Sequence, residues 1–218
     1  MNKEKRFTSN DIEVRKLDDG TELIEGYAIV FDSDSRNLGG FIEQIDPGAL
    51  DNTDTSDVVA LFNHDNNIVL GRTPATLSLT IDKRGLRYSI TPPDTMAAKD
   101  LLTSIKRNDI RGSSFQFSIA KDGDKWNEPA ERGMLWERKI TNISKLWDVS
   151  PVTVPAYEAT DTTVAKRELG IIKDKKELED NKAIERQEAQ QRAIEVEQEQ
   201  MEMEIELLKL NFNLTEDK

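Results

Sequence analysis

His64 is the only histidine in this 218-residue chain, which contains no cysteine. Imidazole is the side chain that ordinarily exchanges a proton near neutral pH, so His64 is the candidate acid or base. It follows the apolar run 58–62, at the point where polar residues begin. Functional side chains are often found where a rigid element ends at a cleft. The alternative interpretation is a histidine that only ends a strand or lies on the surface.

A serine nucleophile would need His64 as its base. Ser113 and Ser114 directly follow Gly112 and begin an apolar β-run. Because a glycine permits a tight backbone turn, a serine at this junction can be held rigidly at a cleft. Adjacent strand residues face opposite sides of a sheet, so only one of the two serines is expected to reach His64.

The third group of such a mechanism is an acid that orients the imidazole. Asp148 lies within the apolar β-run 146–152. A buried carboxylate is costly unless it is paired, so Asp148 either has a partner or faces solvent from an alternating strand. Asp65, next to His64 in the chain, is the rival acid, although neighbouring strand residues point to opposite faces.

The elements that must position these residues are mainly strands. Residues 21–31 predict a strand broken or bulged at Gly26, and residues 77–81 and 86–90 predict a hairpin. Further strands are expected at 113–119 and 140–149.

One helix is expected between Thr95 and Asn108, with Asp94 or Thr95 as its N-terminal cap. Its apolar face is predicted to comprise Met96, Leu101, Leu102 and Ile105. The predicted fold class is therefore α+β, with residues 1–160 forming a compact, mostly antiparallel β-barrel flanked by helices.

Residues 161–218 predict a second region, a charged helical tail. Its apolar stripe is Ile194, Met201, Ile205, Leu208 and Phe212. A local strand over 201–208 is the alternative, but length and glutamate content favour helix. The tail is either a solvated helix or one that forms a coiled coil with a second copy, a scaffold or a capsid segment. Residues 166–182 are expected to be open chain that a protease can cut.

Composition excludes several classes of function. The net charge of −12 argues against general nucleic-acid binding. The absence of cysteine excludes disulfides and thiolate sites, and we expect neither a metal nor a cofactor. No stretch approaches the ~20 apolar residues of a membrane span, and no apolar signal segment follows the N-terminal charges. We therefore expect a soluble protein without a membrane partner.

Six segments together resemble the prohead protease family of tailed bacteriophages, which processes capsid proteins during head maturation. Each is unremarkable alone, but their order along the chain is specific. They are Glu25 to Phe31, Phe41 to Leu50, Leu61 to Asp65, Leu70 to Arg72, Arg111 to Phe115 and Asp148 to Tyr157.

The resemblance implies a serine endopeptidase with a barrel similar to herpesvirus assembly proteases. It makes His64 the base, Ser114 the nucleophile and Asp148 the acid. The family usually has glutamate where this chain has Asp148, and often glycine where it has Gln116.

The oxyanion of such a reaction needs hydrogen-bond donors. Arg111 and the backbone of Gly112, Ser113 and Ser114 are the candidates that the sequence offers.

The resemblance also implies substrates and a location. The expected partners are the major capsid protein or a scaffold segment, the chain itself as a substrate, and a second copy through self-association. The expected location is the host cytoplasm, inside the assembling prohead. The alternatives are an inactive scaffolding or capsid-assembly protein on the same fold, or a β-rich binding module in which His64 and Ser114 lie far apart.

Overall fold

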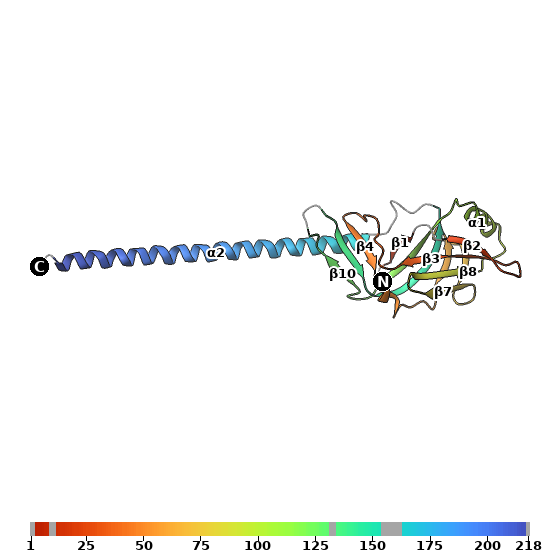
Figure 1. The fold of residues 1–218 in the computed structure, drawn as a ribbon, viewed down its shortest axis with the longest axis horizontal. Helices are drawn as coiled ribbons and strands as arrows, with labels where there is room; N and C mark the ends of the chain where they lie inside the picture. The colour runs from red at the N-terminus through yellow and green to blue at the C-terminus, as the bar shows by residue number, and fades with distance from the viewer. Residues whose placement is uncertain (1–2, 9–11, 131–133, 154–162, 217–218) are drawn as a thin grey trace. The chain divides into compact units, whose positions relative to one another are not determined.

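The computed structural model describes residues 3–8, 12–130, 134–153 and 163–216 (Figure 1). The chain forms two compact units, Met1–Val164 and Ala165–Lys218. The described residues form twelve strands, two α-helices and a short 3-10 helix, Pro47–Leu50. The predicted boundary after residue 160 falls outside the described residues and stays a prediction.

A five-stranded sheet holds the centre of the first unit. Its strand order is β1-β9-β12-β5-β6, and all neighbours are antiparallel except β12 and β5, which are parallel. The strands are β1 (Glu4–Thr8), β9 (Gly112–Ile119), β12 (Ile143–Val152), β5 (Val59–Phe62) and β6 (Asp65–Arg72).

Two smaller sheets complete this unit. The antiparallel four-stranded sheet has the order β2-β3-β8-β7, and the three-stranded sheet has the order β10-β11-β4 with β11 and β4 parallel. Figure 1 shows them toward opposite ends of the unit. Their strands are β2 (Ile12–Lys16), β3 (Glu22–Val30), β8 (Gly85–Ile90), β7 (Leu77–Ile81), β10 (Asp124–Asn127), β11 (Trp136–Ile140) and β4 (Phe41–Ile45).

The core is one cluster of buried apolar side chains from all three sheets, the 3-10 helix and helix α1 (Met96–Lys106). Ile29, Tyr88, Phe117 and Val149 are all fully buried in it. The mixed α+β class with mostly antiparallel strands is confirmed. Over the described strands, however, none of the three sheets closes on itself, so the predicted barrel is not confirmed.

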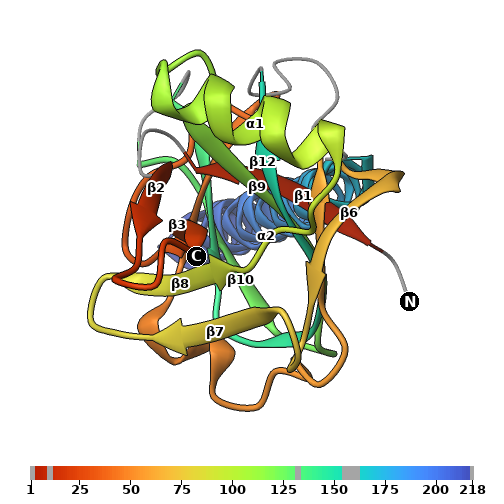
Figure 2. The same ribbon diagram turned by 90° about the vertical axis from the view of Figure 1, so that its right-hand side faces the viewer.

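Helix α1 lies beside β2 (Figure 2) and is capped at its N-terminus by Thr95, whose hydroxyl accepts a hydrogen bond from the Ala98 N–H. Leu101 and Ile105 are buried as predicted. Met96 is not, because 73% of its surface is exposed at the first turn, and Ala98 takes the buried place instead.

The predicted hairpin is present as β7 and β8, paired from Leu77 opposite Ile90 to Ile81 opposite Leu86. The predicted bulge at Gly26 is wrong. Gly26 pairs in register with both neighbouring strands, and the irregularity in β3 lies between Tyr27 and Ile29.

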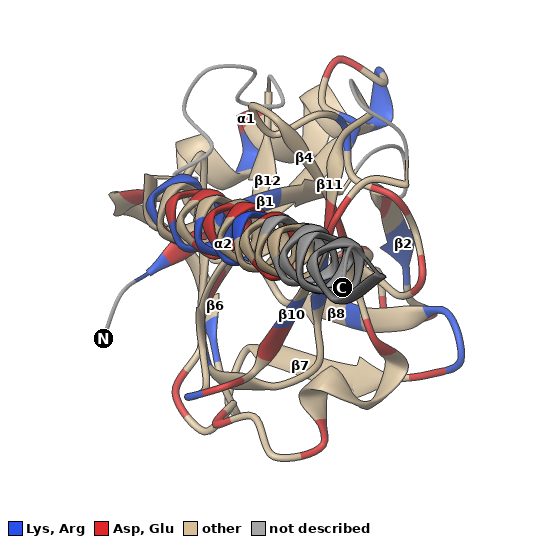
Figure 3. Cartoon of the chain, turned by 90° about the vertical axis from the view of Figure 1, so that its left-hand side faces the viewer, with Lys and Arg blue, Asp and Glu red and all other residues tan. Residues whose placement is uncertain are grey.

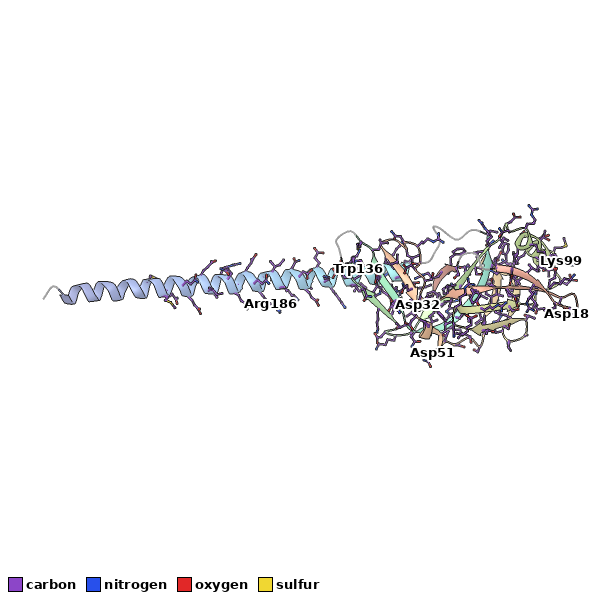
Figure 4. The ribbon with its side chains drawn as sticks, viewed as in Figure 1. Asp18, Asp32, Asp51, Lys99, Trp136 and Arg186 are labelled. Carbon is purple, nitrogen blue, oxygen red and sulfur yellow. The ribbon has the colours of Figure 1, made fainter. Side chains whose placement is uncertain are left out.

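The described part of the second unit is helix α2 (Thr163–Glu216) from Ala165 onward. The helical tail is therefore confirmed, but the expected open chain at 166–182 is wrong, because those residues are helical. Acidic and basic side chains are interspersed along α2 (Figure 3), and Arg186 projects outward from it (Figure 4). Ile194 and Met201 are exposed, while the side chains of Ile205, Leu208 and Phe212 lie outside the described residues.

Candidate active site

Three adjacent strands of the central sheet carry the candidate residues. Ser114 lies on β9 and Asp148 on β12, and His64 follows the end of β5. Ser150 is directly opposite Ser114 in the β9–β12 ladder, and Asp148 is opposite Gln116. Because side chains two residues apart share a face of a strand, Ser114, Asp148 and Ser150 lie on one side of the sheet.

A β-bulge in β12 aims Asp148 at this face. The register shifts between Leu146, opposite Phe117, and Asp148, opposite Gln116, so Trp147 is the extra residue. In a regular strand Leu146 and Asp148 would share a face. The bulge instead leaves Leu146 fully buried in the core and turns Asp148 to the opposite face, as bulges beside active sites commonly do.

His64 occupies a two-residue connection between β5 and β6. Phe62 pairs with Asp65, and the φ angles of Asn63 and His64 are 53° and 58°. Two positive φ angles are typical of the type I′ hairpin turn, a conformation in which Asn and His are more frequent than most residues. The turn is attached to the end of β12, where the Asn63 N–H donates to the Pro151 carbonyl and the Asn63 side chain accepts from the Thr153 N–H, both at 3.0 Å.

This arrangement brings the three predicted residues into one hydrogen-bonded chain. His64 Nε2 lies 2.6 Å from Ser114 Oγ, and His64 Nδ1 lies 2.6 Å from Asp148 Oδ1. An ionised carboxylate only accepts hydrogen bonds, so Nδ1 carries the proton and Nε2 is left to accept from the serine. The geometry is that of a nucleophile, a base and an orienting acid.

Asp148 has a further partner, Ser150, which is not among the residues predicted from the sequence. The Ser150 hydroxyl donates to Asp148 Oδ1 at 2.9 Å and lies 3.3 Å from His64 Nδ1. Ser150 is fully buried and Asp148 is 4% exposed, so this hydrogen bond compensates for part of the desolvation of the carboxylate. The spacing of two residues within a strand was the available signal for Ser150.

The rival residues have other partners. Ser113 faces the opposite side of the sheet, and its hydroxyl lies 2.6 Å from the buried Tyr88 hydroxyl. Asp65 accepts hydrogen bonds from the backbone and side chain of Asn67. The geometry therefore favours Ser114 over Ser113 and Asp148 over Asp65.

The candidate oxyanion residues differ in their surroundings. Arg111 is exposed before the start of β9. Gly112 is needed for close packing rather than for a turn, because a Cβ atom there would lie 2.2 Å from the Phe7 ring. The backbone of Gly112 also does not have a positive φ angle, so its conformation does not require glycine. Gly112 and Ser113 lie within the paired part of β9.

The single hydroxyl proton of Ser114 has an alternative acceptor to His64 Nε2. Ser114 Oγ lies 2.8 Å from the backbone carbonyl oxygen of Arg6, on the neighbouring strand β1. No pattern in the sequence pointed to Arg6, because a backbone contact between residues 108 positions apart depends on strand pairing alone.

The described residues contain no group of three or more His, Asp or Glu side chains that could hold a metal ion. Among these residues no helix is long and apolar enough to cross a membrane.

Residues 10–175 match one family of known proteins, described as caudovirus prohead serine protease. The matched span covers more than half of the chain and includes His64, Ser114 and Asp148. Comparisons with curated proteins and with solved structures find no significant match, so the expected likeness to herpesvirus assembly proteases is not shown.

Proposed function

Because the chain belongs to the caudovirus prohead serine protease family, we propose that it cleaves peptide bonds with Ser114 as nucleophile, His64 as base and Asp148 as orienting acid. The observation that carries this proposal is the hydrogen-bonded chain from Ser114 Oγ through the imidazole to Asp148 Oδ1, with both contacts at 2.6 Å.

The proposed reaction has two halves. Ser114 Oγ attacks the substrate carbonyl carbon while His64 Nε2 takes the hydroxyl proton, and Asp148 stabilises the imidazolium. His64 then gives the proton to the leaving amine, and the acyl group stays on Ser114. Water attacks the ester with His64 again as base, which releases the acid and returns the proton to Ser114. We propose the exposed Arg111 as a donor to the oxyanion, since Gly112 and Ser113 already lie in the strand ladder.

The proposed substrates follow from the family. They are the major capsid protein or a scaffold segment, cut inside the assembling prohead in the host cytoplasm, and the chain itself. Self-cleavage within 166–182 would require local unfolding of α2, because proteases cut extended chain and these residues are helical.

Helix α2 is proposed to recruit these substrates or a second copy. Its described surface combines interspersed charges with half-exposed apolar side chains, among them Ile171, Leu178, Ile184 and Ile194. Such a surface suits pairing with another helix, from a capsid protein, a scaffold or another copy of the chain.

The test is co-expression with the major capsid protein, followed by gel analysis and intact mass of both proteins. We expect Ser114→Ala to abolish processing, because removing a member of such a triad typically costs a factor of about 10³ or more. Ser113→Ala is the matched control, since it removes the adjacent hydroxyl on the other face of the sheet.

Unchanged processing by Ser114→Ala would overturn the proposal. If the wild-type chain also left the capsid protein uncut while assembling with it, the alternative of an inactive assembly protein would hold instead.

A further inference from the structure

The nucleophile is held from two sides. On one side His64 Nε2 lies 2.6 Å from Ser114 Oγ, and on the other the Arg6 carbonyl oxygen lies 2.8 Å away. Strand β1, which supplies that carbonyl, is the outermost strand beside β9, and its Phe7 is directly opposite Ser114. The position of β1 therefore decides where the second acceptor stands.

Buried ion pairs fix β1 from the side chain of the same residue. Arg6 binds Glu43 of β4 through two nitrogens, with both distances 2.6 Å, and also pairs with Glu4. Arg138 of β11 joins the group by donating to Glu4 at 2.8 Å and to Glu43 at 3.1 Å. All four side chains are at most 5% exposed. We call these four residues and Asp124, which binds Arg138, the buried charge cluster.

Strand β1 contributes one charge of each sign to the buried charge cluster. Glu43, Arg138 and Asp124 belong to the three-stranded sheet, whereas Glu4 and Arg6 belong to β1. If β1 left its place, Glu43 would lose its two-pronged partner and Arg138 one of its carboxylates. Leaving buried charges without partners is strongly unfavourable, so the cluster keeps β1 docked.

The far end of β1 is fixed independently of these charges. The Thr8 hydroxyl donates to the Ala28 carbonyl of β3 at 2.7 Å. The Phe7 ring occupies the space that a side chain at Gly112 would fill, two residues before the nucleophile. Strand β1 is thus held by the three-stranded sheet at its charged end, and by β3 and the packing of Phe7 on β9 at its C-terminal end.

We propose that β1 positions the nucleophile, with Arg6 as the positioning residue. Its guanidinium anchors the strand in the buried charge cluster, and its carbonyl holds the Ser114 hydroxyl within reach of His64. This inference rests on the proposed function. It goes beyond the family relationship, because the match begins at residue 10, after β1 ends.

The carbonyl acts before bond formation. The serine has one hydroxyl proton, so its hydrogen bond to the Arg6 carbonyl is exchanged for one to His64 Nε2 before His64 takes the proton and Oγ attacks. Its contribution is to restrict Oγ to an orientation from which attack proceeds. A displacement of about 1 Å at such an atom can cost about 100-fold in rate.

The test compares two lysine variants of the full chain. Arg6→Lys keeps the charge but cannot reproduce the two-pronged contact with Glu43. Arg15→Lys is the matched control, because Arg15 makes the same kind of contact with buried Glu25 from β2, an edge strand of a different sheet. The measurement is covalent labelling of Ser114 by a fluorophosphonate probe over a range of probe concentrations.

We expect Arg6→Lys to lower the maximal labelling rate about tenfold or more, with little change in the probe concentration that gives half of it. Arg15→Lys should label like the wild type. Urea unfolding of both variants at the same pH shows whether any difference follows from stability alone.

Thr8→Val is a second variant in case Arg6→Lys does not fold. It loosens the other end of β1 without touching the buried charge cluster, and it should slow labelling in the same direction. Wild-type labelling rates in Arg6→Lys or Thr8→Val would overturn the positioning role. Absence of labelling at Ser114 in the wild type would instead count against the proposed function itself.

Discussion

The acid of the proposed triad illustrates how neighbouring residues acquire different roles. Asp65 adjoins His64 in the chain, yet its carboxylate accepts from Asn67. Asp148, 84 positions after His64, lies 2.6 Å from its Nδ1. Distance along the chain is thus a poor guide to the partner of a side chain in a turn between strands.

Asp148→Asn is expected to lower kcat by a factor of about 10³–10⁴ while the protein stays folded. An amide carries no charge to stabilise the imidazolium, and its N–H group favours the wrong tautomer of His64. The measurement is the rate of processing of co-expressed capsid protein, or of fluorophosphonate labelling.

Asp65→Asn serves as the control for Asp148→Asn. It makes the same chemical change one residue from His64 and should leave the rate within a few-fold of the wild type. If Asp65→Asn were the more damaging variant, the acid would have to be reassigned.

At the scale of elements, strand packing beside the nucleophile is tight enough to require a glycine. A Cβ atom at Gly112 would lie 2.2 Å from Cε2 of Phe7, well inside van der Waals contact. The glycine thus permits close approach of β1 to β9, and not the tight turn that its place in the sequence predicts.

Gly112→Ala is expected to lower the free energy of unfolding by about 1–3 kcal/mol, because overpacking forces the Phe7 ring and β1 to shift. Phe7→Ala removes the clash, so the double variant should lose less than the sum of the two single losses, with a coupling of about 0.5–3 kcal/mol. The measurement for this double-mutant cycle is the free energy of unfolding in urea of the wild type, the two single variants and the double variant.

Gly170→Ala is the contrasting control for this cycle. A Cβ atom at Gly170 would meet nothing within 4 Å, and residue 170 lies in helix α2. Alanine should therefore leave stability unchanged or raise it slightly. Strict additivity of Gly112→Ala and Phe7→Ala would show that the Phe7 ring does not define the need for glycine.

At the scale of the first unit, ion pairs with low exposure connect strands of different sheets. The buried charge cluster joins β1 of the central sheet to all three strands of the smallest sheet. Within the four-stranded sheet, the more exposed Arg15 of β2 and Arg87 of β8 pair with the buried Glu25 of β3. Such pairs add geometric specificity, but they make the fold depend on the ionisation of the carboxylates.

Two carboxylates of these pairs, Glu4 and Glu25, have lowered pKa values. Burial raises the pKa of Glu4, but the hydrogen bond from Arg138 and the charges of Arg6 and Arg138 outweigh it, so the pKa falls below its ordinary 4.5. The hydrogen bond from Arg15 lowers the pKa of Glu25, against its desolvation. Each contribution to stability is therefore complete above about pH 4.5 and is lost as the pH falls through the folded-state pKa.

We expect the free energy of unfolding to be steady from pH 7 to about 5 and to fall steeply below about 4.5. Glu4→Gln should flatten that fall, although it also lowers stability at pH 7 because Arg138 loses a charged partner. Urea unfolding at several pH values gives the change of the free energy of unfolding with pH for both chains.

The effect of salt on stability distinguishes the buried ion pairs from the exposed ones. About 1 M salt screens exposed pairs such as Lys99–Asp94 but acts weakly on the buried charge cluster. An acid-induced loss that disappears in salt, or that is unchanged in Glu4→Gln, would contradict the assignment to this cluster.

Much of the local structure could be predicted from the sequence, because it depends on periodicity and on caps. The hairpin of β7 and β8, helix α1 with its Thr95 cap, and the helical tail follow from residue types at fixed spacing. The same patterns failed at Met96 and at Gly26, where burial and register depend on the neighbouring strand or turn.

The sequence by itself determined the candidate chemistry: one imidazole, two adjacent serines and an acid within an apolar run. The residue types alone left two serines and two acids open, and the family resemblance favoured Ser114 and Asp148. Only the tertiary structure brings these two to the imidazole, because their contact depends on the β9–β12 register, the bulge at Trp147 and the turn at His64. It also revealed Ser150 and the Arg6 carbonyl as partners. Strand pairing and backbone contacts join residues that are far apart in the chain, so no local pattern encodes them.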